Sequence, residues 1–182
     1  SLLFYNSGWR GMHVEPTPAY ANAMREARPD ETVIQAAVSG SAAPVSFYEI
    51  PNTGLSTGLA SLAEVHKDAG FPVRQITVPT VTLASLFDLM GPEPIHWLKI
   101  DVEGMEGDVI ESWGSHPSRP AALVIEATVP MSQTPNYEGW HGAIIERGYH
   151  EVLFDGLSLY FIHESEADRG SDLALSPNVF DG

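Results

Sequence analysis

The chain has 182 residues, a formal net charge of −15 and no cysteine. This length fits one domain with its own hydrophobic core, so we expect a single domain over residues 1–182. The negative charge argues against nucleic acid or anionic membranes as partners, and the absence of thiols excludes disulfides and favours a cytoplasmic location. No apolar run approaches the roughly 20 residues that span a bilayer, so membrane insertion is not expected.

The first half of the chain predicts short strands around one clear helix. Residues 11–15 have strand character, and Thr17 followed by Pro18 predicts a helix that begins there and ends before Pro29. The stretch PNTGLSTGLASL at residues 51–62 is rich in Gly, Ser and Thr and predicts a loop. Three further stretches have the apolar, β-branched character of strands: residues 32–39, 45–50 and 73–81.

The second half predicts alternating helices and strands that end in a hairpin. Helices are expected over residues 83–90, after Gly104 and over residues 137–147. Strands are expected over residues 95–101, 121–126, 151–154 and 157–163, the last two joined by Asp155-Gly156. This alternation predicts a mostly parallel α/β sheet covered on both faces, with a C-terminal antiparallel hairpin.

Three of the predicted strands end in an acidic residue, namely Glu15, Asp101 and Glu126. Because the carboxyl ends of the strands border the ligand crevice of an open α/β sheet, these carboxylates are expected around one cleft. Glu15 either accepts hydrogen bonds from a ribose diol or only supports the following helix N-terminus, and both interpretations stay open. Asp101 ends an apolar strand, so a ligand, a water-filled cleft or Lys99 must compensate its charge.

Three more acids follow Asp101 closely in the stretch WLKIDVEGMEGDVI at residues 97–110. Glu106 and Asp108 fall in the first turn of the predicted helix, where the helix dipole favours negative charge. Glu103 either acts in the same way or reaches into the cleft. The histidines show no zinc-binding spacing and no metal site is predicted, although coordination of a divalent metal by Asp101 and Glu126 stays open.

Several motifs resemble the FkbM family of S-adenosylmethionine-dependent methyltransferases. The resemblance extends over nearly the whole chain, and its segments are GWRGMHVEPTPAY (8–20), TLASLF (82–87), LKIDVEGMEGDVI (98–110), LVIEAT (123–128), FDGLSLYFI (154–162) and SPNVFDG (176–182). It implies a Rossmann-like class I methyltransferase that uses S-adenosyl-L-methionine. Such enzymes usually methylate a hydroxyl oxygen, so the expected partner is a small-molecule or glycan acceptor. The family's first strand and glycine-rich loop should precede GWRG, so we expect the sequence to be incomplete at its N-terminus.

The resemblance also implies roles for individual residues. Glu15, followed by Pro16, would bind the ribose of the cofactor, and Ala37 and Val38 would lie near the adenine. Asp101 would face the methionine moiety and the reacting centre, with Glu103 beside it.

The leading hypothesis is therefore methyl transfer to an acceptor hydroxyl. Asp101 would act as the base or orient the acceptor, Glu126 would assist through a hydrogen bond, and Ser56 and Thr57 in the GLSTG loop would contact the acceptor. One alternative is a metal-dependent glycosyltransferase in which Asp101 and Glu103 act as a DxD-like pair. Another is a degenerate domain kept as an interaction module. The sequence does not indicate the acceptor or the oligomeric state.

Overall fold

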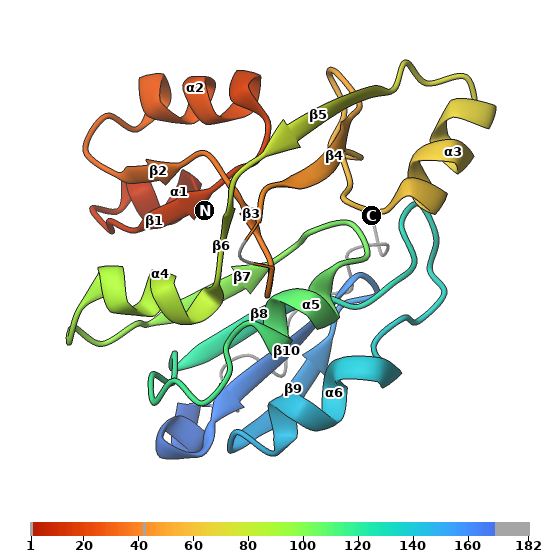
Figure 1. Ribbon diagram of the computed structural model, residues 1–182. Helices are drawn as coiled ribbons and strands as arrows, with labels where there is room; N and C mark the ends of the chain where they lie inside the picture. Colours follow the sequence, from red (N-terminus) through yellow and green to blue (C-terminus); the bar gives the residue numbers. More distant parts are fainter. Residues whose placement is uncertain (1, 42, 170–182) are drawn as a thin grey trace.

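The computed structural model describes residues 2–41 and 43–169, which form a mixed arrangement of helices and strands (Figure 1). The helices are α1 (Leu2–Asn6), α2 (Pro18–Ala27), α3 (Ala60–Asp68), α4 (Leu83–Met90), α5 (Glu106–Glu111), α6 (Glu138–Ile145) and the 3₁₀ helix η1 (Glu164–Arg169). The strands are β1 (Met12–Val14), β2 (Thr32–Ile34), β3 (Ala37–Val38), β4 (Val45–Glu49), β5 (Arg74–Val78), β6 (Thr80–Val81), β7 (Trp97–Ile100), β8 (Ala122–Glu126), β9 (Tyr149–Phe154) and β10 (Ser158–His163). The family-like segment at residues 176–182 lies outside the described residues.

The strands form one four-stranded sheet and three two-stranded ones. The larger sheet has the order β7-β8-β10-β9, in which β7 and β8 are parallel and the β9-β10 hairpin is antiparallel, as the sequence predicts. β1 pairs with β2 and β3 with β6 in parallel, whereas β4 and β5 form an antiparallel pair. Parallel and antiparallel pairings are therefore balanced, and a mostly parallel sheet is not what the hydrogen bonds show. The difference arises mainly where β5 returns along β4.

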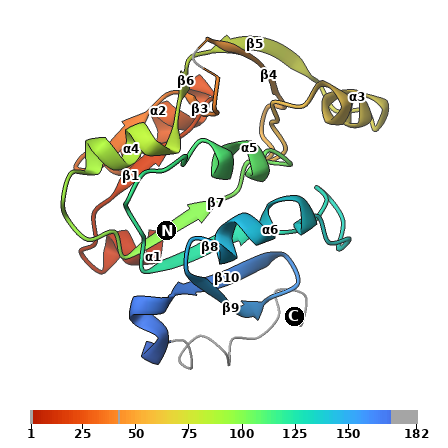
Figure 2. The ribbon, with the colours of Figure 1, turned by 60° about the horizontal axis from the view of Figure 1, so that its bottom comes forward.

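The main core lies between the four-stranded sheet and the helices that follow β7 and β8. α5 and α6 pack side by side over this sheet (Figures 1 and 2). Trp113, Ile144, Tyr149 and Phe161 are all fully buried in this cluster. Burial of each such side chain contributes about 1.5–3 kcal/mol, so this half of the molecule is a rigid support for the carboxyl ends of β7 and β8.

Three helices depart from the expectations from sequence, among them η1, which was not predicted. α1 was not predicted, and α3 lies partly within the stretch expected to be a loop and continues beyond it. The Gly, Ser and Thr content of residues 51–58 masks the change to better helix formers from Ala60 onward. Ala63 and His66, three residues apart on one helix face, are the buried positions of α3.

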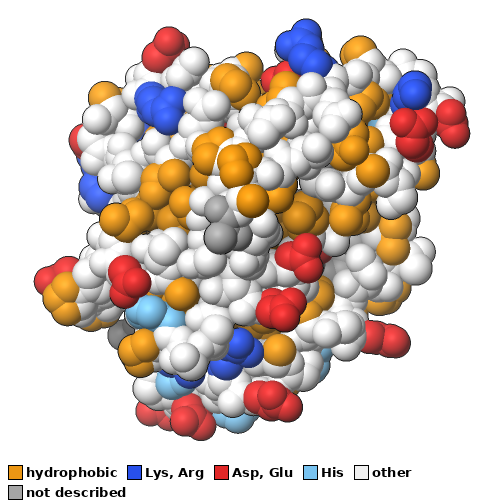
Figure 3. Space-filling view, in the orientation of Figure 1, with side chains coloured by type: hydrophobic (Ala, Val, Ile, Leu, Met, Phe, Trp, Pro, Cys, Tyr) orange, Lys and Arg blue, Asp and Glu red, His pale blue; other side chains and the backbone are white. Residues whose placement is uncertain are grey.

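The surface reflects the composition of the chain. Figure 3 shows acidic side chains scattered over the visible face, with hydrophobic side chains gathered in a band across it. In the part of the chain that the structure describes, no helix has the length and apolar character needed to cross a membrane.

Candidate functional site

The site is organised by the loop that joins β7 to α5. Glu103 and Gly104 both adopt the left-handed backbone region, with φ of 52° and 94°, a conformation that costs energy for a non-glycine residue. Glu106 Oε1 accepts hydrogen bonds from the backbone N–H groups of Val102 (3.3 Å) and Gly104 (3.2 Å). The Thr57 hydroxyl donates to the backbone carbonyl of Glu103 at 3.0 Å. These contacts fix the loop and thereby the position of the Glu103 side chain.

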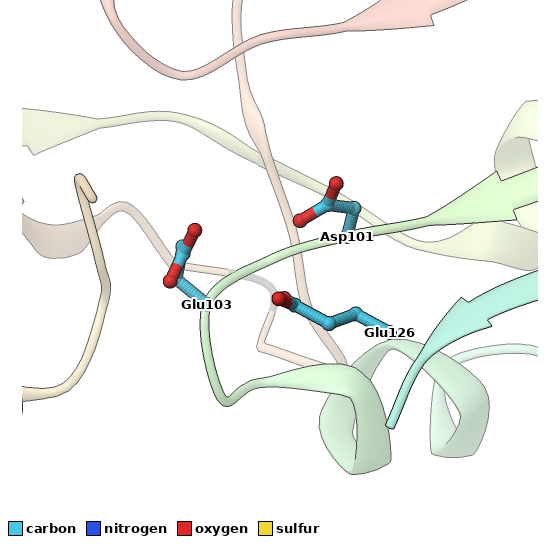
Figure 4. A group of neighbouring side chains, drawn as sticks. All are labelled: Asp101, Glu103 and Glu126. Atoms are coloured by element: carbon cyan, nitrogen blue, oxygen red, sulfur yellow. The ribbon is translucent and has the colours of Figure 1, made fainter. Parts of the chain in front are cut away.

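Three carboxylates converge beside this loop. One oxygen from each of Asp101, Glu103 and Glu126 lies within 4.8 Å of the others. Figure 4 shows Glu126 extending from the end of β8 toward the segment that carries Asp101 and Glu103. The convergence of Asp101 and Glu126 follows from the parallel pairing of β7 with β8, in which Ile100 lies opposite Ile125.

The three acids differ in their partners. Lys99 Nζ donates to Asp101 Oδ2 at 2.7 Å, which fulfils the expectation that Lys99 pairs with a nearby acid. Glu126 is 8% exposed, and its Oε2 is buried without a hydrogen-bond partner among the described residues. A buried acceptor without a donor costs about 1–3 kcal/mol. While Glu126 is ionised, its Oε2 is therefore unsatisfied by the described residues.

Burial and repulsion between like charges raise the pKa values of Glu126 and Glu103. Burial raises the pKa of Glu126 to about 8, and the negative charges of Asp101 and Glu103 add to this effect. Burial likewise raises the pKa of Glu103 to about 7, reinforced by the charges of Asp101 and Glu106. Strong shifts of this kind in a cleft are a mark of functional sites.

A pocket of about 150 Å³ adjoins the carboxylates. Seven of the nine residues proposed from sequence border it: Glu15, Pro16, Ala37, Val38, Ser56, Asp101 and Glu103. The remaining two, Glu126 and Thr57, do not border it. Glu126 is one of the three clustered carboxylates. Thr57 is fully buried, and its hydroxyl donates a hydrogen bond to the backbone carbonyl of Glu103.

Glu15 has both a structural contact and a free oxygen. Its Oε1 accepts hydrogen bonds from the backbone N–H (2.7 Å) and the hydroxyl (2.6 Å) of Thr17, at the start of α2. No donor among the described residues binds its Oε2. Support of the helix N-terminus and ligand binding are therefore compatible at Glu15, since each uses a different oxygen.

Sequence reasoning missed several residues of the pocket wall. The additional lining residues are Val14, Tyr20, Ala36, Phe47, Thr53, Gly54, Val102 and Met105. The Tyr20 hydroxyl donates to the backbone carbonyl of Thr53 at 2.6 Å, so α2 holds the GLSTG loop in place. Tyr20 lies in the helix predicted to begin after Thr17, and no local signal distinguishes a core tyrosine from one that borders a pocket.

A second cavity, of about 470 Å³, lies between β1 and β7. Consecutive residues of both strands, 12–14 of β1 and 97–100 of β7, line it. Because neighbouring residues of a strand point to opposite faces, this lining shows that the cavity opens along the strand edges. It shares Glu15 and Asp101 with the smaller pocket, so the two cavities adjoin at the candidate site.

The sequence was compared with models of known protein families, with curated proteins and with solved structures. The model of a family described as Methyltransferase FkbM domain matches residues 1–151. The chain belongs to the FkbM methyltransferase family. No curated protein matches the chain, and no solved structure does. Membership confirms the resemblance carried by the EP and KIDVEG motifs, and it gives the glycosyltransferase alternative no support.

Proposed function

We propose that this FkbM-family protein is an S-adenosylmethionine-dependent O-methyltransferase acting on a hydroxyl of a sugar or other natural product, in the cytoplasm. The observation that carries the proposal is the shared pocket. The residues expected to bind the cofactor, at the ends of β1 and β3, border the same space as Asp101 and Glu103. Family membership supplies the reaction class, and the pocket supplies one place where cofactor and acceptor would meet.

The residues present fit a nucleoside cofactor. Glu15 Oε2 is available to accept hydrogen bonds from a ribose diol, while its Oε1 holds Thr17. Ala37, Val38 and Phe47 offer an apolar wall for a purine. The two adjoining cavities together fall within the roughly 300–1,000 Å³ typical of small-molecule sites. When bound, the cofactor supplies an electrophilic methyl group on its sulfonium.

The acidic residues would act on the acceptor hydroxyl. An alcohol must lose its proton as its oxygen attacks, and a carboxylate within hydrogen-bond reach accepts that proton or holds the hydroxyl in line. Asp101 and Glu103 border the pocket and are assigned this role, with Glu126 close to them. Ser56 borders the pocket as well and would contact the acceptor. Thr57 is buried, so we assign it the positioning of Glu103.

We further propose that β1-β2 and β7-β8 belong to one Rossmann-like class I sheet. Both pairs are parallel, and the edges of β1 and β7 face the same cavity. The sheet would then continue across this cavity from β1 to β7.

The cofactor proposal is tested by calorimetric titration of the full-length protein with S-adenosylhomocysteine. We expect binding at a one-to-one ratio, with an affinity lowered at least tenfold by Glu15→Gln. Glutamine keeps a carbonyl oxygen for Thr17 but is a poorer acceptor for a diol than a carboxylate. Glu26→Gln, an exposed position on α2, is the matched control and should bind as the wild type does.

The opposing results are equally clear. Absence of S-adenosylhomocysteine binding in the folded full-length protein would support a degenerate domain that serves as an interaction module. Binding that Glu15→Gln leaves unchanged would remove the ribose role from Glu15.

A further inference from the structure

The three carboxylates carry more negative charge than the neighbouring residues balance. Asp101, Glu103 and Glu126 contribute up to three negative charges, and Lys99 is the basic residue that pairs with the group in the described structure. The nearby Glu106 is held by backbone N–H groups and adds no positive charge. Full ionisation of the three carboxylates therefore leaves a net charge of −2 in a partly buried place. One divalent cation would neutralise this charge.

Glu126 provides a second, independent indication. Its side chain is more than nine-tenths buried, and Oε2 has no hydrogen-bond donor in the described part of the chain. Figure 4 shows this carboxylate directed toward Asp101 and Glu103. A buried carboxylate aimed at two other carboxylates has only a cation or a donated proton as a favourable partner.

The separation of the oxygens fits a hard cation. Ca²⁺ binds oxygen ligands at about 2.3–2.6 Å, so no two of its ligand oxygens lie more than roughly 4.6–5.2 Å apart. The three carboxylate oxygens lie within 4.8 Å of one another, so their spacing is compatible with that limit. Mg²⁺ binds at about 2.0–2.1 Å and would need the side chains to close by several tenths of an ångström. Asp101 and Glu103, which are not buried, have room for that adjustment.

We propose that Asp101, Glu103 and Glu126 form a divalent-cation site with all-oxygen ligands. The three side chains occupy one side of the ion, and the side facing the pocket stays open to water or to a ligand oxygen. The left-handed backbone at Glu103, held by Thr57 and Glu106, brings the second ligand close to the other two.

The open side of the ion faces the pocket that Asp101 and Glu103 border. If the proposed methyl transfer holds, the cation would bind the acceptor hydroxyl and favour its ionised form, which makes vicinal diols or other chelating hydroxyls the preferred acceptor class. This role in acceptor binding rests on the proposed function, whereas the cation site itself does not.

Mn²⁺ titration followed by electron paramagnetic resonance tests the site without any methyl-transfer assay. We expect chelator-treated full-length protein to remove one equivalent of free Mn²⁺ signal, in competition with Ca²⁺ and Mg²⁺. Glu126→Gln and Glu103→Gln should each weaken Mn²⁺ binding at least tenfold. Glu111→Gln removes the same charge from an exposed position on α5 and should change the affinity less than twofold.

Absence of stoichiometric Mn²⁺ binding in the wild type would overturn the proposal, as would equal binding by Glu126→Gln and Glu111→Gln. Thermal unfolding in excess chelator shows whether each variant is folded. If Glu126→Gln does not fold, Asp101→Asn, at an exposed position, provides a further variant. Mn²⁺ binding without S-adenosylhomocysteine binding would keep the cation site and refute the proposed function. The reverse result would keep the function and refute the cation site.

Discussion

The carboxylates of Glu31 and Glu126 are both buried, but their surroundings are opposite. The Glu31 side chain is 5% exposed, and its Oε2 lies 2.7 Å from His13 Nε2 and 3.4 Å from Arg28. Glu126 lies against two other carboxylates, and its Oε2 has no donor in residues 2–41 and 43–169. Burial opposes ionisation at both sites, yet the contacts from His13 and Arg28 outweigh it and lower the pKa of Glu31, whereas the pKa of Glu126 rises to about 8.

The comparison separates an acid whose charge has partners within the described fold from one whose charge has none. Glu31 ties β1 to the segment before β2 and is satisfied within the fold, so its loss should cost stability. We expect ionised Glu126 to destabilise the fold in the absence of a ligand, because its Oε2 has no donor among the described residues. Variants of the two regions should therefore differ in which property they change.

The largest expected effect is on turnover at the candidate site. Asp101→Asn should lower kcat by roughly 100-fold or more, because general-base catalysis typically contributes 10²–10⁴-fold. Stability should change little, since the Lys99–Asp101 pair is largely exposed and such pairs contribute about 0–1 kcal/mol. Formation of S-adenosylhomocysteine with an identified acceptor provides the measurement.

Asp108→Asn is the control for Asp101→Asn. Asp108 is exposed on α5, and its replacement removes the same charge seven residues away without touching the pocket. Turnover by Asp108→Asn should match the wild type within about twofold. If Asp101→Asn also kept near-normal turnover, Asp101 would have no role in proton transfer or acceptor orientation.

The next effect is on stability at the structural site. Glu31→Gln should lower the free energy of unfolding by about 2 kcal/mol in urea titrations, because Arg28 and His13 lose their negatively charged partner. The matched control, Glu64→Gln, breaks an exposed pair with Lys67. It should change the free energy of unfolding by less than about 0.5 kcal/mol. Equal small effects of both variants would show that Glu31 contributes no more than a surface acid.

The pH dependence sharpens the Glu31 test. Because the pKa of Glu31 is lowered in the folded protein, its stabilisation is present above the unfolded-state value of about 4.3 and is lost as the pH falls through the folded-state pKa. The stability difference between wild type and Glu31→Gln should shrink as the pH falls through the folded-state pKa of Glu31. A difference that stayed constant down to pH 3 would contradict the lowered pKa.

Predictability from the sequence also differs between the two regions. Asp101 and Glu126 were expected to meet because both end buried strands, and the parallel β7-β8 pairing confirms that. The Glu31 contacts were not predicted: His13 lies 18 residues away, and nothing local marks Glu31 as buried. Strand ends follow from periodicity, whereas side-chain pairs across elements depend on tertiary packing.

The same limit applies to Glu106. Its position in the first turn of a helix predicted an acid favoured by the helix dipole, with no indication of its burial. In the structure it is 3% exposed and binds the N–H groups that hold the loop around Glu103. The sequence places a carboxylate at the helix start correctly, but the loop that folds back over it depends on the left-handed conformation of Glu103, which a non-glycine residue does not signal.

The smallest predicted effect is a gain in stability at a buried position, where most substitutions lower stability. In excess chelator, Glu126→Gln should raise the free energy of unfolding at pH 8 by about 1 kcal/mol, because it removes one of three clustered charges while nearly keeping the volume. Glu111→Gln, exposed on α5, should stay within about 0.5 kcal/mol of the wild type. Saturating Ca²⁺ should reverse the order, since a ligand that binds only the folded wild type stabilises it by mass action. Destabilisation by Glu126→Gln in chelator as large as that of Glu31→Gln would make Glu126 a second structural acid and remove the distinction between the two regions.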